Sequence, residues 1–384
     1  DGELAAVASA LAFARAPSRG RGAFLEWSVR LHDRPIVVFD ERAVVHPTRA
    51  YIARLPDPDP GKLRITFLVA SLPLAGGVIS IVHVARELML AGHDVKIVTE
   101  AHEITPELLN IWTQPLIYRD AEHLIEQLPP SDIVVATFWV TAHRYLPAIR
   151  ERYDCATAYY VQDYEPLFYP EDEVDIRRDA AASYDLSDHF VFASQWIADQ
   201  VGTRRGTGEV VPLDVDLDVF YDRGNRVSSR MRIVSVAEPG FEKRRRGFRE
   251  TVEAFRRVHG LHPDVELVFF GADDAHMPEL PFPYVNAGRL YNQNDVARLV
   301  SSAHVLVDAS VWQGFGRPGL EAMACGTVPV LTGVGGLFEY ARDGENSLLT
   351  ASNDPELIAA AICRLVEDRA LWQQLSANGR SSAE

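Results

Sequence analysis

The sequence predicts an α/β protein of two doubly wound domains, each a parallel sheet covered by helices. From Leu63 onward, apolar runs of strand length alternate with amphipathic runs of helix length, which is typical of βαβ units. The alternation stops in a glycine-rich stretch, Gly202 to Asn225, and then begins a second time. A chain of 384 residues is long enough for two such domains, each with its own core.

The first series of elements defines an amino-terminal domain over residues 61–208. A helical pattern, Val78 to Ala91, follows its first apolar run. The expected strands are Arg64–Ala70, Asp94–Thr99, Ile133–Thr137, Thr157–Gln162 and His189–Ala193. Residues 1–60 differ from this pattern, because they combine a predicted helix, Glu3–Ala16, with a strand, Pro35–Phe39, and a proline-rich linker, Leu55–Gly61.

The second series defines a carboxyl-terminal domain over residues 209–384. Its expected strands are Arg232–Val236, Glu266–Phe270, His304–Asp308 and Val328–Leu331. The helical patterns between and after them are Phe248–His259, Asn294–Ser301 and Glu356–Glu367. Doubly wound domains bind ligands at the carboxyl ends of their strands, so we expect the site in the cleft between the two domains.

Composition narrows the class of protein. The net charge of -16 argues against a nucleic-acid partner, because a polyanion would be repelled. The three cysteines lack metal-binding spacing, which favours a reduced, cytoplasmic protein. We expect neither a signal peptide nor a transmembrane helix, since no apolar run is long enough. Peripheral contact with the inner face of a membrane stays open.

The segment VWQGFGRPGLEAMACGTVPV, Val311 to Val330, has the local pattern of a nucleotide site. Pro318 suits the first turn of a helix and Gly326 the residue after its end, which predicts a helix over Pro318–Cys325. Three amides at its start would lack helical partners and could hold a phosphate, those of Gly316, Gly319 and Leu320. Glu321 could accept two hydrogen bonds from a ribose diol. A tight loop before a buried αβ unit would show the same spacing.

Two further segments follow predicted strands and could contact phosphate. SLPLAGGV places Gly76 and Gly77 at the start of a helix, but the dinucleotide pattern GxGxxG fails there, although Glu100 lies where a ribose-binding acid would be. A paired glycine can instead let a phosphate or a sugar approach, or be a plain turn. PGFEKRRRGF concentrates basic residues that could clamp a diphosphate or form a solvated face: Lys243, Arg244, Arg245 and Arg246.

Two acidic segments could bind a metal ion or a sugar. DVDLD, Asp214 to Asp218, fails as a calcium loop because Val219 and Asn225 occupy the positions that need Gly and Glu. A carboxylate pair holding Mg²⁺ on a diphosphate stays open, with an interdomain loop as the preferred interpretation. VQDYEPLFYPEDE leaves a strand with acidic and aromatic side chains, which are typical of sugar binding but also of a packing loop: Asp163, Tyr164, Glu165 and Tyr169.

Together these segments resemble the retaining GT-B glycosyltransferases of family four, from about Leu63 onward. SVWQGFGRPGLEAMACGTVPV resembles the family motif S-x-x-E-G-F-G-x-P-x-x-E-A-M-A-C-G-x-P-V, and VPLDVDLDVF resembles its P-N-G-V-D-x-x-x-F loop. VQDYEPLFYP is similar to rhamnosyltransferases of bacterial surface-glycan synthesis. Two positions depart from the pattern, since Gln313 replaces a glutamate and Glu238 an arginine.

The resemblance implies two Rossmann-like domains and transfer of a sugar, with retention and without a metal or cofactor, from a dTDP-, UDP- or GDP-linked donor to a glycan or lipid-linked acceptor. It implies catalytic roles for Lys243, Arg244, Arg246 and Gln313. Donor contacts would come from Gly76, Gly77, Gly314, Phe315, Gly316, Gly319, Leu320 and Glu321. Acceptor contacts would come from Asp163, Tyr164 and Glu165. A non-catalytic sugar- or nucleotide-binding module and a dinucleotide-dependent oxidoreductase or epimerase remain as alternatives.

Overall fold

The computed structural model describes residues 61–72, 75–100, 113, 115–202, 207–226, 230–238 and 245–384. The helix and strand expected before residue 60, together with Lys243 and Arg244, lie outside these residues. The chain divides into two compact units between Leu213 and Asp214, inside the glycine-rich stretch that separates the two series. Among the described residues, no helix has the length and apolar character needed to span a membrane.

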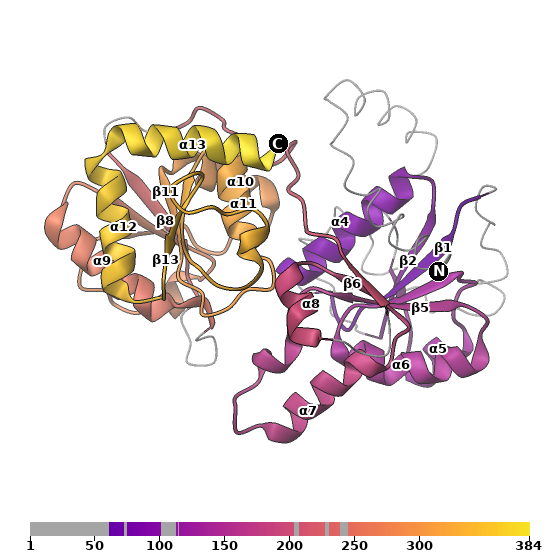
Figure 1. Ribbon diagram of the computed structural model, residues 1–384. Coiled ribbons are helices and arrows are strands. Elements are labelled where there is room, and N and C mark those ends of the chain that lie inside the picture. The colour runs from indigo at the N-terminus through magenta and orange to yellow at the C-terminus, as the bar shows by residue number, and fades with distance from the viewer. Residues whose placement is uncertain are drawn as a thin grey trace. The chain divides into compact units, whose positions relative to one another are not determined.

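The first unit contains a fully parallel sheet in the order β3-β2-β1-β4-β5-β6-β7 (Figure 1). Its strands are β1 (Arg64–Leu68), β2 (Asp94–Thr99), β3 (Leu116–Ile117), β4 (Ile133–Ala136), β5 (Ala156–Val161), β6 (His189–Phe192) and β7 (Thr207–Val210). Its helices are α4 (Gly76–Leu90), α5 (Ala121–Glu126), α6 (Trp139–Arg152), α7 (Val174–Ala182) and α8 (Gln195–Val201), with the 3-10 turns η2 (Glu165–Phe168) and η3 (Ser183–Asp185).

Alternating strand residues build separate cores on the two faces of this sheet. Phe67 and Tyr160 pack on the face that α4 covers, through Ile81 and Leu88. Neighbouring residues such as Tyr159 point to the other face, which α5, α6 and α8 cover. A parallel sheet buried on both faces explains why its central strands are almost continuously apolar.

The second unit repeats this plan in the order β10-β9-β8-β11-β12-β13. Its strands are β8 (Arg232–Val236), β9 (Glu266–Phe270), β10 (Val285–Asn286), β11 (Val305–Asp308), β12 (Val328–Thr332) and β13 (Leu348–Thr350). Its helices are α9 (Phe248–Leu261), α10 (Gln293–Ser302), α11 (Arg317–Ala324), α12 (Pro355–Glu367) and α13 (Arg369–Ala383), with the 3-10 turns η5 (Asp274–His276) and η6 (Gly335–Glu339).

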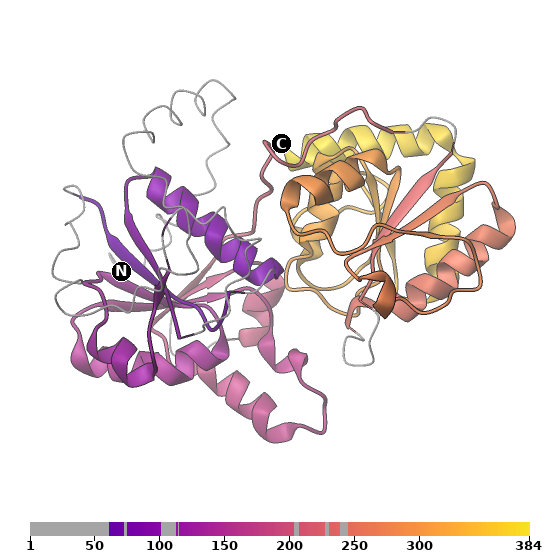
Figure 2. The same ribbon diagram turned by 180° about the vertical axis from the view of Figure 1, so that it is seen from behind.

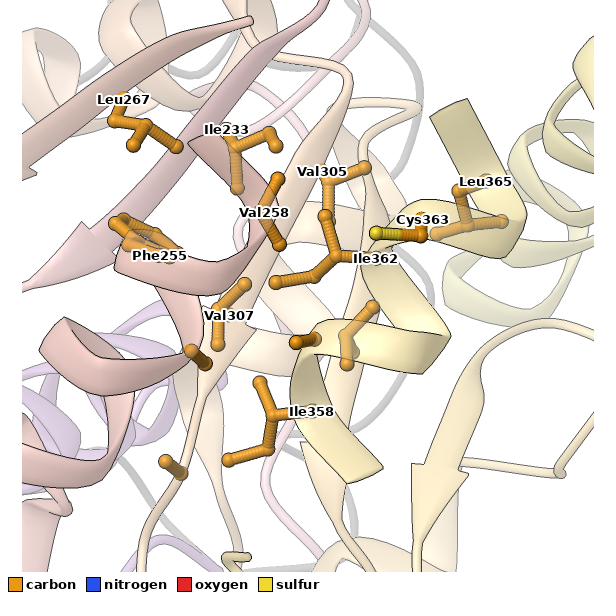
Figure 3. Packing of buried hydrophobic residues seen from close by; sticks show 14 of the residues in the cluster. Ile233, Phe255, Val258, Leu267, Val305, Val307, Ile358, Ile362, Cys363 and Leu365 are labelled. Carbon is orange, nitrogen blue, oxygen red and sulfur yellow. The ribbon is translucent and has the colours of Figure 1, made fainter. Parts of the chain in front are cut away.

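Helices cover both faces of the second sheet, with α9 and α12 on one side and α10 and α11 on the other (Figures 1 and 2). Phe255 and Val258 of α9 and Ile362 of α12 pack onto Ile233 and Val305 of the strands (Figure 3). Burying a side chain of this size contributes about 1.5–3 kcal/mol, so this layer fixes the strands whose carboxyl ends carry the candidate site.

Candidate active site

The sheet of the second unit has one point at which its strand order reverses, between β8 and β11. In doubly wound sheets, ligands bind in the crevice outside the carboxyl ends of the strands at such a point. The segment after β8 carries the basic run, and the segment after β11 leads through Gln313 to α11. The topology therefore brings together two motifs that are about seventy residues apart in the sequence.

Backbone contacts join these two segments. The amide of Val311 donates to the carbonyl oxygen of Arg245 at 2.7 Å. Gly247, with φ of +63°, lies so close that a Cβ there would be 2.1 Å from the carbonyl oxygen of Ala309. The guanidinium of Arg245 lies 5.8 Å from the centre of the Trp312 ring. Arg245 and Arg246 are thus held beside the loop that carries Gln313, whereas the positions of Lys243 and Arg244 are not described.

Helix α11 begins at Arg317, one residue before the predicted start. Its N-cap Gly316 has φ of +87°, a conformation that favours glycine. The amide of Gly319 donates to the carbonyl oxygen of Gly316 at 3.1 Å. The prediction that this amide lacks a helical partner is therefore wrong, because the first turn tightens into a 3-10 bond.

Tyr340, the residue directly after η6, supports the glycine loop. The hydroxyl of Tyr340 donates to the carbonyl oxygen of Gly316 at 2.5 Å, and a Cβ on Gly319 would be 2.4 Å from that hydroxyl oxygen. Phe315, which is buried, packs against the Tyr340 ring at 5.4 Å. Burial, with the charges of Asp308 and Glu321, raises the pKa of Tyr340 well above its ordinary value, although a hydrogen bond with the Leu320 backbone acts in the opposite direction.

Glu321 lies one turn into α11, and its side chain is 15% exposed. Arg317 pairs with it across one helical turn, with Nε and Nη2 both 3.2 Å from Oε1. The pairing neutralises much of the charge at this end of the helix but leaves Oε2 outside these two contacts. Arg317 had no predicted role, although its i,i+4 spacing from Glu321 is the signal that predicts the pair.

Gln313 is 2% exposed, and its backbone is fixed by η6. The amide of Gly336 donates to its carbonyl oxygen at 2.8 Å, and a Cβ on Gly335 would be 2.0 Å from that oxygen. Its side-chain Oε1 and Nε2 are buried and have no hydrogen-bond partner among the residues that the structure describes. Oε1 would be 2.8 Å from a Cβ on Gly316, so the unsatisfied amide lies against the glycine loop. Gly314, the next residue, is also buried.

Gly76 and Gly77 occupy the first turn of α4 in the first unit and are exposed. The N-cap Ala75 provides no side-chain hydrogen bond to this helix. A Cβ on Gly77 would be 3.7 Å from the side-chain amide of Gln162, so ordinary contact with β5's end would result. The pair therefore lies at a strand-to-helix turn at the carboxyl end of β1, as predicted.

In the acidic loop after β5, Glu165 follows the packing interpretation and not the acceptor contact that the resemblance implies. Glu165 is 2% exposed and accepts hydrogen bonds at Oε2 from the Trp139 amide at 2.6 Å and the Tyr159 hydroxyl at 2.7 Å. Burial raises its pKa to about 8, although these two bonds act in the opposite direction. Tyr164 stacks on Tyr184 at 5.9 Å. Glu165 thus lies inside the unit, where its carboxylate accepts from the first amide of α6, next to the Phe138 amide that donates to the Thr141 hydroxyl.

Asp163 is also buried, and its Oδ1 accepts from the amide of Tyr164 at 2.9 Å. Asp163 also raises the pKa of Glu165 through charge repulsion, although burial is the larger cause. Asp163 and Glu165 therefore serve the loop's own backbone and α6, whereas Phe168 is exposed and Tyr169 is partly exposed.

Glu100, the carboxylate that a dinucleotide site would use for ribose, has other partners. Arg144 donates to it through Nε at 2.9 Å and Nη2 at 2.5 Å, and the Tyr145 hydroxyl donates at 2.5 Å. A ribose would have to displace a charge-assisted pair. This geometry counts against the dinucleotide alternative.

The aspartates of DVDLD form a turn. Oδ1 of Asp216 accepts from the Asp218 amide at 3.1 Å, and its carbonyl oxygen accepts from the Phe220 amide at 2.7 Å. Across the described ranges, no group of three or more His, Cys, Asp or Glu side chains is arranged to hold a metal ion.

Comparisons with known proteins agree with this fold. Residues 231–368 match the family model described as Glycosyl transferases group 1. Over 182 residues the chain is 31% identical to the MMP alpha-(1->4)-mannosyltransferase of Mycolicibacterium hassiacum, covering 45% of this chain and 43% of that protein. Over 181 residues it is 30% identical to the lipopolysaccharide core biosynthesis glycosyltransferase LpsE of Rhizobium meliloti, covering 46% and 50%. The chain thus matches half or less of the length of these relatives.

Solved structures share the fold. HepE of Anabaena, in complex with UDP and glucose, aligns with a TM-score of 0.70 at 17% identity over 84% of this chain and 94% of that chain. The sucrose-phosphate synthase of Thermosynechococcus elongatus aligns with a TM-score of 0.65 at 19% identity over the same shares. The predicted fold class, two Rossmann-like α/β domains as in GT-B glycosyltransferases, is confirmed. The resemblance to glycosyltransferases is supported, whereas rhamnose specificity and retention remain predictions.

Proposed function

We propose that the protein transfers a sugar from a nucleoside-diphosphate sugar to a hydroxyl group of a glycan or lipid-linked acceptor. The observation that carries the proposal is the buried, unsatisfied amide of Gln313 beside the glycine loop of α11. An amide buried without partners costs about 1–3 kcal/mol, and a sugar hydroxyl can both donate to it and accept from it. The similarity of residues 231–368 to group 1 glycosyl transferases supports the same conclusion.

In this proposal the second unit holds the donor. Glu321 accepts from the ribose diol while Arg317 holds its other oxygen, and Gln313 contacts the transferred sugar. The start of α11, with Gly314, Phe315, Gly316, Gly319 and Leu320, faces the diphosphate and lets it approach the backbone closely, although the Gly319 amide itself donates to Gly316. Donor contacts from Gly76 and Gly77 are part of the proposal as well. The nucleotide is dTDP, UDP or GDP, and HepE, a protein of the same fold, has been solved with UDP.

The basic run supplies the charge that the reaction needs. Lys243, Arg244 and Arg246 stabilise the negative charge that develops on the leaving diphosphate. That diphosphate accepts the proton of the attacking hydroxyl on the same face of the sugar, so configuration is retained without a protein nucleophile. No metal or cofactor takes part in this scheme. We further propose a rhamnosyl donor, on the resemblance of VQDYEPLFYP, and a role in surface-polysaccharide synthesis at the cytoplasmic face of the membrane.

Release of nucleoside diphosphate tests the proposal. The purified protein is incubated with UDP-, GDP-, ADP- and dTDP-sugars, including dTDP-rhamnose, with and without a mixture of methyl glycosides as acceptors. We expect one donor to give release that the glycosides accelerate. Glu321→Gln should slow it, while the control Glu266→Gln, which breaks a similar arginine pair at the amino end of β9, should not. Donor binding without release would instead favour the non-catalytic module.

A further inference from the structure

Four aromatic side chains gather at the carboxyl edge of the first unit's sheet. Phe138 and Trp139 follow β4 after Thr137, and Phe168 and Tyr169 come from the segment after β5. The rings of Phe138 and Phe168 stack at 6.4 Å with 23° between their planes, and those of Trp139 and Tyr169 meet edge to face at 6.0 Å. We call these four residues the aromatic surface.

The aromatic surface lies where this fold places ligands. Strand order in the first sheet reverses between β1 and β4, and Phe138 and Trp139 leave the carboxyl end of β4 at that reversal. The hydroxyl of Thr137, the residue before them, donates to the carbonyl oxygen of Leu68 in β1 at 2.7 Å, which ties the two strand ends together. The position corresponds to that of the donor site in the second sheet, which also lies at a reversal of strand order.

Hydrogen bonds fix the orientation of these rings. The indole Nε1 of Trp139 donates to the Tyr169 hydroxyl at 2.8 Å, and the backbone amide of Trp139 donates to Glu165 at 2.6 Å. Glu165 is itself held by Tyr159. Glu165 therefore acts through Trp139 as a positioning residue. A rigid ring loses little conformational entropy when a ligand binds, so this arrangement suits recognition.

The rings are not simply core residues. Phe168 is 39% exposed, and Phe138, Trp139 and Tyr169 are each partly exposed. A pyranose ring presents apolar C–H groups on its faces and hydroxyls around its rim, which match flat aromatic faces with polar edges. The adjoining segment 171–179 carries five carboxylates and two arginines, which disfavours an anionic ligand. The chemistry therefore favours an uncharged sugar over a phosphorylated one.

We propose that the aromatic surface binds the pyranose ring of an uncharged carbohydrate acceptor, with Phe168 stacking on the sugar. This inference rests on the proposed transferase function, and it replaces Glu165 and Tyr164 as acceptor contacts by the aromatic residues beside them. The proposal names the chemical class of the acceptor: the hydroxyl that receives the transferred sugar belongs to another, uncharged sugar.

Saturation-transfer-difference NMR tests the inference on the full chain, with the methyl glycosides of rhamnose, mannose, glucose and galactose as probes and a nucleoside diphosphate present to fill the donor site. We expect transfer to the ring protons of at least one glycoside. Phe168→Tyr should retain it, whereas Phe168→Leu, which keeps an apolar side chain but loses the flat ring, should reduce it about fivefold. Leu261→Ala, which trims an exposed side chain in the second unit, should leave it unchanged.

Equal signals from Phe168→Leu and the wild type, or no transfer to any glycoside, would overturn the aromatic surface as the acceptor site. Calorimetric titration with UDP, GDP, ADP and dTDP, run on the same preparations, keeps this outcome separate from the proposed function. Nucleotide binding that persists when the glycoside result fails leaves the donor proposal standing, whereas loss of nucleotide binding in the wild type contradicts the proposed function itself.

Discussion

Gln313 and Glu321 have different environments, and the difference predicts different roles. Glu321 is held by Arg317, whereas the Gln313 amide is enclosed with no partner among the described residues. Glu321→Gln should weaken binding of the free nucleoside diphosphate by about 1 kcal/mol or more, because a charge-assisted bond to the ribose becomes a neutral one. Gln313→Glu should instead change the ranking of donor sugars.

The measurement combines calorimetric titration with the nucleoside diphosphate and competition between donor sugars. We expect Gln313→Glu to leave the free nucleotide's affinity nearly unchanged, because this residue contacts the sugar and not the nucleotide. The separation of roles is wrong if Gln313→Glu weakens the free nucleotide as much as Glu321→Gln does, or if the donor ranking stays the same.

Tyr340 supports the glycine loop through one hydroxyl. Tyr340→Phe keeps the ring against Phe315 but removes the donor to the Gly316 carbonyl. We expect it to lower the free energy of unfolding by about 1 kcal/mol in urea titrations. The control is Tyr284→Phe, whose hydroxyl makes only a 3.5 Å contact with the Pro278 carbonyl. Equal losses of unfolding free energy in the two variants would contradict the role of the Tyr340 hydroxyl in supporting the loop.

Two buried titratable groups lie at the ends of elements: Glu165 of η2 accepts from the first amide of α6, and His304 directly precedes β11. Burial raises the pKa of Glu165 to about 8, so the folded state binds more protons than the unfolded state from about pH 4.5 to 8. Burial and three arginines lower the pKa of His304 to about 4, so the unfolded state binds more protons from about pH 4 to 6.5.

The signs of the two contributions are therefore opposite. The Glu165 contribution to stability should fall as pH rises through its window, and the His304 contribution should rise through its own. We expect Glu165→Gln to flatten the first slope and His304→Gln the second, in urea titrations followed at several pH values. Unchanged slopes in the two variants would contradict the assignment of these groups.

Elements differ in how well the sequence predicts them. The strands β2, β8 and β9 have the predicted bounds, because each is a run of strand length in which most side chains are buried. The four strands that were not predicted, β3, β7, β10 and β13, are the edge strands of the two sheets and are two to four residues long. Such short segments pair on one side only and carry too little periodicity to stand out.

The candidate site is also only partly predictable from the sequence. The glycine loop and the position of α11 are predictable within one residue, because proline and glycine act locally. The sequence does not predict the contact of Tyr340 with Gly316 or that of Arg245 with Val311. Both contacts join segments that only the folded sheet brings together. Glu165 was assigned to the acceptor because its residue type suits sugar hydroxyls, but the fold uses that carboxylate to cap α6.

The proposed source of positive charge predicts that sugar transfer needs no metal ion. If arginine, lysine and helix amides face the diphosphate, sugar transfer should continue in EDTA at close to its original rate. The assay is nucleoside diphosphate release before and after chelation, with a metal-dependent glycosyltransferase as the control. If chelation abolishes release and Mg²⁺ or Mn²⁺ restores it, the scheme without a metal is wrong, and Asp214 and Asp216 become the candidate metal ligands.

The claim that the second unit binds a nucleoside-diphosphate sugar is tested most directly by thermal unfolding against UDP-, GDP-, ADP- and dTDP-sugars. A ligand at about a hundred times its dissociation constant stabilises the folded state by about 2.7 kcal/mol. We therefore expect the sugars of one nucleotide to raise the unfolding temperature more than those of the other three. The shift should shrink in Glu321→Gln and persist in Glu266→Gln. If no nucleotide sugar shifts the wild-type transition, or if the shift is equal in both variants, the donor site is not where the glycine loop and α11 place it.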